Sequence, residues 1–123
     1  MEIKSYRDLR VWQSGMELVV MVYEISEKFP SKEVYGLTSQ IRRATVSVPS
    51  NIAEGHTRES TKEYLHHLSI AQASLAEVET QIEIAFRLKY CPQEELDRIQ
   101  THCSSLGKQL YSLRDALNSK KQP

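Results

Sequence analysis

Glycine, proline and cysteine are scarce in this sequence, with four, four and two residues among 123. So few turn-forming residues do not suit an all-β protein, and no long segment alternates apolar and polar residues. Cys91 lies beside Pro92 at the start of an expected helix, and Cys103 lies twelve residues further along it, about 18 Å away at 1.5 Å per residue, which is beyond the reach of a disulfide. The sequence therefore predicts an all-α protein with reduced cysteines.

An excess of either charge is also absent, since 16 Lys and Arg residues balance 16 Asp and Glu residues. No part of the chain is strongly basic or acidic, so nothing attracts nucleic acid or anionic lipid over long range. The N-terminal segment MEIKSYRDLR lacks the apolar core of a signal peptide, and the longest uncharged stretch, 64–76, is too short to span a bilayer. We expect a cytoplasmic protein with one domain over residues 1–123 and a short disordered C-terminal tail from about residue 119.

Four segments carry apolar residues at alternating spacings of three and four, as amphipathic helices do. The expected helices cover about 6–28, 38–54, 60–89 and 92–118. Gly55 suits a left-handed stop after the second helix, Ser60 and Glu63 form a capping-box pattern, and Pro92 suits a first helical turn. Short connections between the helices favour an antiparallel up-and-down four-helix bundle. A coiled-coil rod is the alternative, although the connections are rich in turn residues.

The stretch 35–55, YGLTSQIRRATVSVPSNIAEG, places a proline inside the second expected helix. A proline there removes one backbone hydrogen bond and costs roughly 3 kcal/mol. Because the apolar spacing continues past it, we expect Pro49 to bend the helix without ending it. We also expect Ser50 or Asn51 to lie near the carbonyl group freed around Thr45.

The first expected helix has two apolar stripes on nearly opposite sides. One stripe consists of Val11, Leu18, Val22, Ile25 and Phe29. The other stripe consists of Leu9, Trp12, Met16, Val19, Val20 and Tyr23. Only one stripe can fill the core of the bundle, and an exposed apolar stripe usually marks an interface. The alternative is a central position for this helix in an irregular bundle.

The second stripe is richer in the Trp, Tyr and Met side chains that are favoured at interface cores. We therefore assign subunit contacts to Leu9, Trp12, Met16, Val19 and Tyr23, and the bundle core to the first stripe. A ring of subunits requires a head-to-tail contact, for which the outer face of the second helix around Val46 is the expected partner surface. Changing Trp12 and Met16 together to glutamate should then give a soluble helical monomer.

No pattern of catalytic or metal-binding residues stands out. One Glu-x-x-His motif, Glu63 to His66, matches part of the carboxylate-bridged metal sites of four-helix bundles. Both residues point away from the apolar stripe of their helix, and no second motif occurs. The histidines include no pair at i, i+4, and neither a phosphate loop nor a nucleophile elbow is found. We expect no enzyme activity, no cofactor and no metal.

Arg42 and Arg43 remain as candidate nucleic-acid-binding residues. Both are expected to project outward beside Val46, where planar guanidinium groups suit phosphates and carboxylates equally. The alternative is that they form salt bridges within the helix or between subunits, on a solvated face.

Three stretches, YRDLRVWQSGMELV, FPSKEVYGLTSQIRRATVSVPSNIAEG and TKEYLHHLSIAQASLAEVETQI, resemble a bacterial family of four-helix-bundle proteins. That family includes proteins encoded in intervening sequences of large-subunit ribosomal RNA genes, and it is similar to the accessory variability determinant of diversity-generating retroelements. The resemblance implies a ring-like homopentamer and, for the retroelement branch, binding of a reverse transcriptase and nucleic acid. This chain is neutral where the retroelement proteins look strongly basic, which counts against affinity for phosphates.

The expected function is that of a non-catalytic homo-oligomeric scaffold or interaction module. The alternative is a nucleic-acid accessory protein, with RNA, DNA or a reverse transcriptase as partner, whose ring concentrates Arg42 and Arg43. A metal-dependent enzyme is a third and more distant reading.

Overall fold

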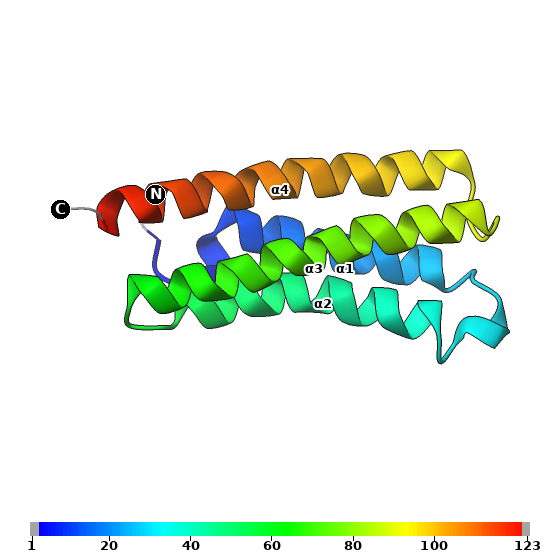
Figure 1. The fold of residues 1–123 in the computed structure, drawn as a ribbon, viewed down its shortest axis with the longest axis horizontal. Coiled ribbons are helices and arrows are strands. Elements are labelled where there is room, and N and C mark those ends of the chain that lie inside the picture. The colour runs from blue at the N-terminus through cyan, green and yellow to red at the C-terminus, as the bar shows by residue number, and fades with distance from the viewer. Residues whose placement is uncertain (1–2, 122–123) are drawn as a thin grey trace.

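The computed structural model of the chain describes residues 3–121. In this range the chain forms four α-helices, two short 3-10 helices and no strand, which confirms the predicted all-α class. The elements are η1 (Tyr6–Asp8), α1 (Arg10–Ser26), η2 (Ser31–Glu33), α2 (Leu37–His56), α3 (Thr61–Arg87) and α4 (Gln93–Lys121). Each long helix runs antiparallel to the next, and α4 closes the bundle by packing against α1 (Figure 1).

Each helix supplies one apolar stripe to the core. The buried residues of α1 are Val11, Leu18, Val22 and Ile25, together with Gly15 and Ser26, and Phe29 is buried three residues after the helix ends. These apolar residues are the stripe that the sequence assigns to the bundle core. The remaining helices bury their own residues at spacings of three and four, including Ile41, Val48 and Ile52 of α2, Leu68, Leu75 and Ile82 of α3, and Ile99, Leu106 and Leu110 of α4.

The first helix begins later than expected because residues 5–8 form a separate turn. Ser5 Oγ accepts a hydrogen bond from the Arg7 N–H, and Asp8 Oδ2 accepts from the Ser5 N–H, so both side chains cap backbone N–H groups of this turn. Leu9 is extended, with φ −76° and ψ 126°, and separates η1 from α1. At the other end of the chain α4 continues through Lys121, so residues 119–121 are helical where a disordered tail was expected. The last two residues of the chain lie outside the described range.

Pro49 lies inside α2, which continues for seven residues beyond it to His56. A Cβ built on Gly15 of α1 would lie 3.3 Å from Pro49 Cβ, so the glycine lets α1 and α2 approach closely at the proline. The helix is uninterrupted, as predicted, but the polar partner differs from the expectation. Asn51 Nδ2 donates to the Ser47 carbonyl at 2.9 Å and not to the carbonyl freed at Thr45.

Gly55 is helical and has no positive φ, so the expected left-handed stop at this residue is wrong. Its position is explained by packing, because an added Cβ would lie 2.8 Å from His67 Cβ and 3.0 Å from Tyr64 Cδ1 of α3. Among residues 3–121, the residue with a positive φ is Lys89, at 67°, just after α3. There the Tyr90 N–H bonds to the Ala85 carbonyl at 2.8 Å, as in a Schellman motif.

Both cysteines are buried and free. Burial raises the pKa of the Cys103 thiol to about 12 and also raises the pKa of Cys91, so neither thiol is activated as a nucleophile. Within residues 3–121, none of the helices combines the length and the apolar character needed to cross a lipid bilayer.

Candidate interaction surface

The second stripe of α1 is divided between packed and exposed side chains. Met16, Val20 and Tyr23 are 42%, 56% and 41% exposed, which is unusual for three apolar residues within two turns of one helix. Leu9, Trp12 and Val19 are half-buried. The exposed part of the stripe therefore lies toward the middle and C-terminal half of α1.

Trp12 is covered by the N-terminal turn of its own chain. Its ring meets the ring of Tyr6 edge-on at 5.4 Å between centroids, and the Arg7 guanidinium lies 5.6 Å from the indole. Gln13 Nε2 donates to the Arg7 carbonyl at 2.9 Å and fixes the turn against α1. Trp12 thus has an intramolecular role that the sequence pattern did not indicate.

Apolar exposure continues from α1 onto α2 and the segment before it. Tyr23, Val46 and Val34 line a shared hollow of about 440 Å³, whose polar wall is formed by Arg42 and Arg43. Tyr35, in the segment before α2, is 95% exposed. We call Met16, Val20, Tyr23, Val34, Tyr35 and Val46 the α1–α2 patch. Val46 therefore adjoins Tyr23 on this one surface of the chain.

Arg42 folds back onto α1, so the expectation that both arginines project outward is wrong for this residue. Its Nε donates to Ser26 Oγ at 2.8 Å, and its Nη2 donates to the Tyr23 carbonyl at 3.3 Å and to Glu27 Oε2 at 3.2 Å. The guanidinium also lies 4.5 Å from the centroid of the Tyr23 ring. A cation at the last carbonyls of α1 stabilises that helix end, so Arg42 is part of the α1–α2 contact.

Arg43 is exposed, as predicted. Among residues 3–121, no ion pair involves it. It borders the hollow of the α1–α2 patch on one side and a polar cavity of about 270 Å³ between α2 and α3 on the other. Across that cavity lies Glu77.

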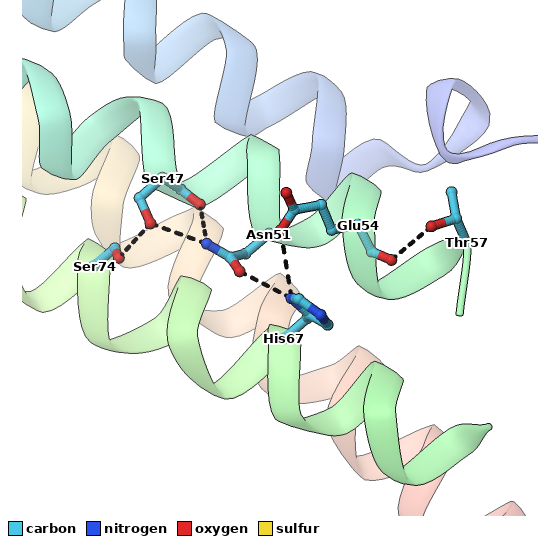
Figure 2. A network of polar contacts seen from close by, with 6 residues as sticks. All are labelled: Ser47, Asn51, Glu54, Thr57, His67 and Ser74. Carbon is cyan, nitrogen blue, oxygen red and sulfur yellow. Dashed lines mark hydrogen bonds and ion pairs between the residues drawn. The ribbon is translucent and has the colours of Figure 1, made fainter. Parts of the chain in front are cut away.

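A chain of polar contacts joins α2 to α3 beside Pro49 (Figure 2). Ser74 Oγ donates to Ser47 Oγ at 2.9 Å, Asn51 Nδ2 donates to Ser47 Oγ at 3.0 Å, and His67 Nδ1 lies 3.0 Å from Asn51 Oδ1. His67 Nδ1 also lies 3.6 Å from a carboxylate oxygen of Glu54. We call this chain of polar contacts the seam. The sequence carried only a weak signal for it, namely the polar residues Ser47 and Asn51, four positions apart beside the apolar stripe of α2.

The seam fixes the proton on His67. Asn51 Nδ2 must face Ser47 because the Ser47 carbonyl can only accept a hydrogen bond. Asn51 Oδ1 therefore faces His67 and can only accept, so His67 Nδ1 carries a proton. His67 contacts the Asn51 amide and the Glu54 carboxylate, so the seam resembles a structural link between helices. Within the seam, His67 makes no contact with a serine hydroxyl that it could activate as a nucleophile.

The remaining histidines and carboxylates do not converge. Glu63 and His66 are both exposed on α3, and the Ser60 hydroxyl accepts from the Glu63 N–H as the capping pattern predicts. His102 Nε2 of α4 lies 2.8 Å from the Ser14 carbonyl oxygen and 3.3 Å from the Ser14 hydroxyl oxygen of α1. In the part of the chain that the structure describes, no three His, Cys, Asp or Glu side chains are grouped to hold a metal ion.

Comparison with known proteins agrees with this fold. The crystal structure of a protein of unknown function from the S23 ribosomal protein family of Bacteroides thetaiotaomicron matches with a TM-score of 0.78. The two sequences are 22% identical, and the match covers 85% of this chain and 95% of that one. No curated protein matches the chain in sequence. The family model described as 23S rRNA-intervening sequence protein matches residues 7–112. The chain therefore belongs to the 23S rRNA-intervening sequence protein family.

Proposed function

We propose that this protein is a non-catalytic, cytoplasmic scaffold or interaction protein whose subunits assemble into a ring, with five subunits as the family resemblance implies. The observation that carries the proposal is the α1–α2 patch, in which Met16, Val20 and Tyr23 remain exposed after the bundle core is full. A contiguous exposed apolar surface is costly in water and is typical of a protein–protein interface.

The chemistry of the α1–α2 patch supports a protein contact. Besides three valines, it combines tyrosine and methionine side chains with two guanidinium groups, and these are residue types enriched at the cores of interfaces. Leu9, Trp12 and Val19 belong to the same stripe of α1, are half-buried, and are expected to lose further exposure in the assembly.

The test compares the wild-type protein with a Met16→Glu, Val20→Glu double variant by analytical ultracentrifugation. Both side chains are exposed, so the charges should leave the bundle folded and abolish the assembly. This pair is preferable to changing Trp12, because Trp12 also holds the N-terminal turn. Tyr111→Glu is the matched control, since Tyr111 is an exposed aromatic residue of α4 that borders a hollow between α3 and α4 and is not part of the patch. A wild-type protein that is monomeric at micromolar concentration would refute the proposal.

A second candidate function is the binding of RNA or DNA, alone or with a reverse transcriptase as partner. The observation in its favour is Arg43, an exposed cation without an ion-pair partner in residues 3–121, which a ring would repeat once in each subunit. Arg42 contributes less to this candidate than the sequence predicts, because its guanidinium already bonds to Ser26, Tyr23 and Glu27.

The nucleic-acid candidate predicts binding whose affinity falls steeply with salt concentration. Arg43→Ala should weaken binding and flatten that dependence without a change in stability. Arg42→Ala should instead lower stability, because it removes the contacts that join α1 to α2. A wild-type protein that shows no binding to single-stranded RNA or DNA at low salt contradicts this candidate.

A further inference from the structure

Contacts between helices fix which residues of α1 and α3 lie at the same level along the bundle. Gly15 of α1 lies against Pro49 of α2. Two residues further along α2, Asn51 contacts His67 of α3. Because α1 and α3 both run antiparallel to α2, the residues just after Gly15 are level with the residues just after His67. Ile70 is therefore level with the beginning of the α1–α2 patch.

Two further contacts extend this alignment. Arg43 and Glu77 line one cavity and so lie at the same level of α2 and α3. At the end of α3, the Tyr90 hydroxyl donates to Glu33 Oε2 at 2.7 Å. That bond brings the end of α3 level with residues 34–35, which complete the patch.

The outer side of α3 carries a second exposed stripe. Ile70, Ile84 and Leu88 are all exposed, and Glu77 lies midway between the two isoleucines at a spacing of seven. Residues at i, i+7, i+14 and i+18 share one side of a helix. We call Ile70, Glu77, Ile84 and Leu88 the α3 stripe. It lies on the opposite flank of α2 from the exposed residues of α1, because Glu77 borders the cavity between α2 and α3.

We propose that the α3 stripe of one subunit docks on the α1–α2 patch of the next. This inference rests on the assembly proposed above and names the surface that completes the contact. The two surfaces differ, as a head-to-tail contact in a closed ring requires. They lie on opposite sides of α2. A two-fold contact of the patch with its own copy would leave the α3 stripe exposed.

The levels of the two surfaces match when the ring axis runs parallel to the helices. Ile70 of the partner subunit then meets Met16 and Val20. At the other end, Ile84 of the partner subunit reaches the level of Val34, close to the exposed ring of Tyr35.

In the middle of the same contact, a carboxylate of one subunit faces guanidinium groups of the next. Glu77 of the partner subunit comes level with the hollow that Arg42 and Arg43 border. In residues 3–121 neither Glu77 nor Arg43 has an ion-pair partner within its own chain. An opposite charge from the next subunit gives register and specificity to an otherwise apolar contact. In this arrangement the outer face of α2 points toward the ring axis.

The test uses one substitution on each surface, measured by analytical ultracentrifugation with circular dichroism to verify folding. Val20→Glu disables the patch, and Ile70→Glu disables the α3 stripe, so each variant alone should be a helical monomer. An equimolar mixture should form a one-to-one heterodimer, because one intact patch and one intact stripe remain. Ile84→Glu is a second variant of the stripe and replaces Ile70→Glu if that protein does not fold. Tyr111→Glu should assemble as the wild type does.

The outcomes separate this inference from the assembly on which it rests. If Val20→Glu is monomeric while the folded stripe variants assemble fully, the α3 stripe is not the partner surface, but the proposed assembly stands. If the two variants form no heterodimer when mixed, the direct docking of stripe on patch is refuted. If the wild-type protein is itself monomeric, both the assembly and this inference fail.

Discussion

Gly55→Ala should destabilise the protein, because α2 and α3 approach each other closely at this glycine. An added methyl group would lie 2.8 Å from His67 Cβ, 3.0 Å from Tyr64 Cδ1 and 3.2 Å from the Tyr64 carbonyl oxygen. The Tyr64 oxygen is a backbone atom and His67 Cβ is bonded directly to the backbone, so neither atom can move away unless α3 shifts. Forcing a methyl group into such a contact costs about 1–3 kcal/mol.

Part of that cost is offset by helix propensity. Alanine is favoured over glycine by up to about 1 kcal/mol in a helix interior, and by less near a helix end such as this one. We therefore expect a net loss of about 1–2 kcal/mol, or a fall in Tm of roughly 4 °C per kcal/mol for a chain of this size. The loss should appear as a lower denaturation midpoint with an unchanged slope.

The same substitution at Gly107 is the matched control. An added methyl group there would lie 3.6 Å from Leu75 Cδ2 and 3.8 Å from Gln72 Nε2, which are ordinary contacts. Gly107 is in the middle of α4, so Gly107→Ala should stabilise the protein by about 1 kcal/mol. Both proteins are to be unfolded in urea at one concentration, followed by circular dichroism, because assembly makes the midpoint depend on concentration. Shifts of the same sign in the two variants would refute this account of Gly55.

Three further predictions concern single side chains. Thr45→Val should raise the free energy of unfolding by about 1 kcal/mol in urea titrations, because Thr45 is fully buried and its hydroxyl has no hydrogen-bond partner among residues 3–121; a loss of stability would contradict this. Lys89→Gly should stabilise the protein by about 1 kcal/mol, since Lys89 has a φ of 67° that glycine adopts without strain, and an unchanged Tm would show that the turn tolerates lysine. Hydrogen bonds from the Leu37 N–H and the Tyr90 hydroxyl lower the pKa of Glu33, so their contribution to stability is complete above the ordinary pKa of glutamate and is lost as the pH falls through the lowered value. Denaturation midpoints measured against pH should fall less steeply in acid for Tyr90→Phe than for the wild type, and identical curves would rule out this role of Tyr90.

The apolar spacing in the sequence determined most of the fold. The existence and order of the four helices, the Ser60 cap and the buried stripe of α1 follow from local patterns, because a helix places residues three and four apart on one side whatever surrounds it. Three stretches, of which the run around Pro49 is the most specific, indicated the family, and the match over residues 7–112 confirms it.

Local spacing could not show what lies across from a side chain. The exposed part of the second stripe and the outward position of Arg43 were predictable, but the fold of Arg42 onto α1 was not. That position depends on a serine and a carbonyl sixteen to nineteen residues earlier in the chain. The cover that Tyr6 places over Trp12 depends likewise on how the N-terminal turn meets α1.

The sequence by itself therefore determined the number of helices, the side that each one buries and the excess of apolar surface on α1. Only the tertiary structure decided that Gly15 and Gly55 are spacers between helices, and that Val46 adjoins Tyr23 on one surface. Only the tertiary structure, again, placed Glu77 level with Arg43. The physical reason is that periodicity is a property of one helix, whereas spacing, level and register arise when two helices pack together.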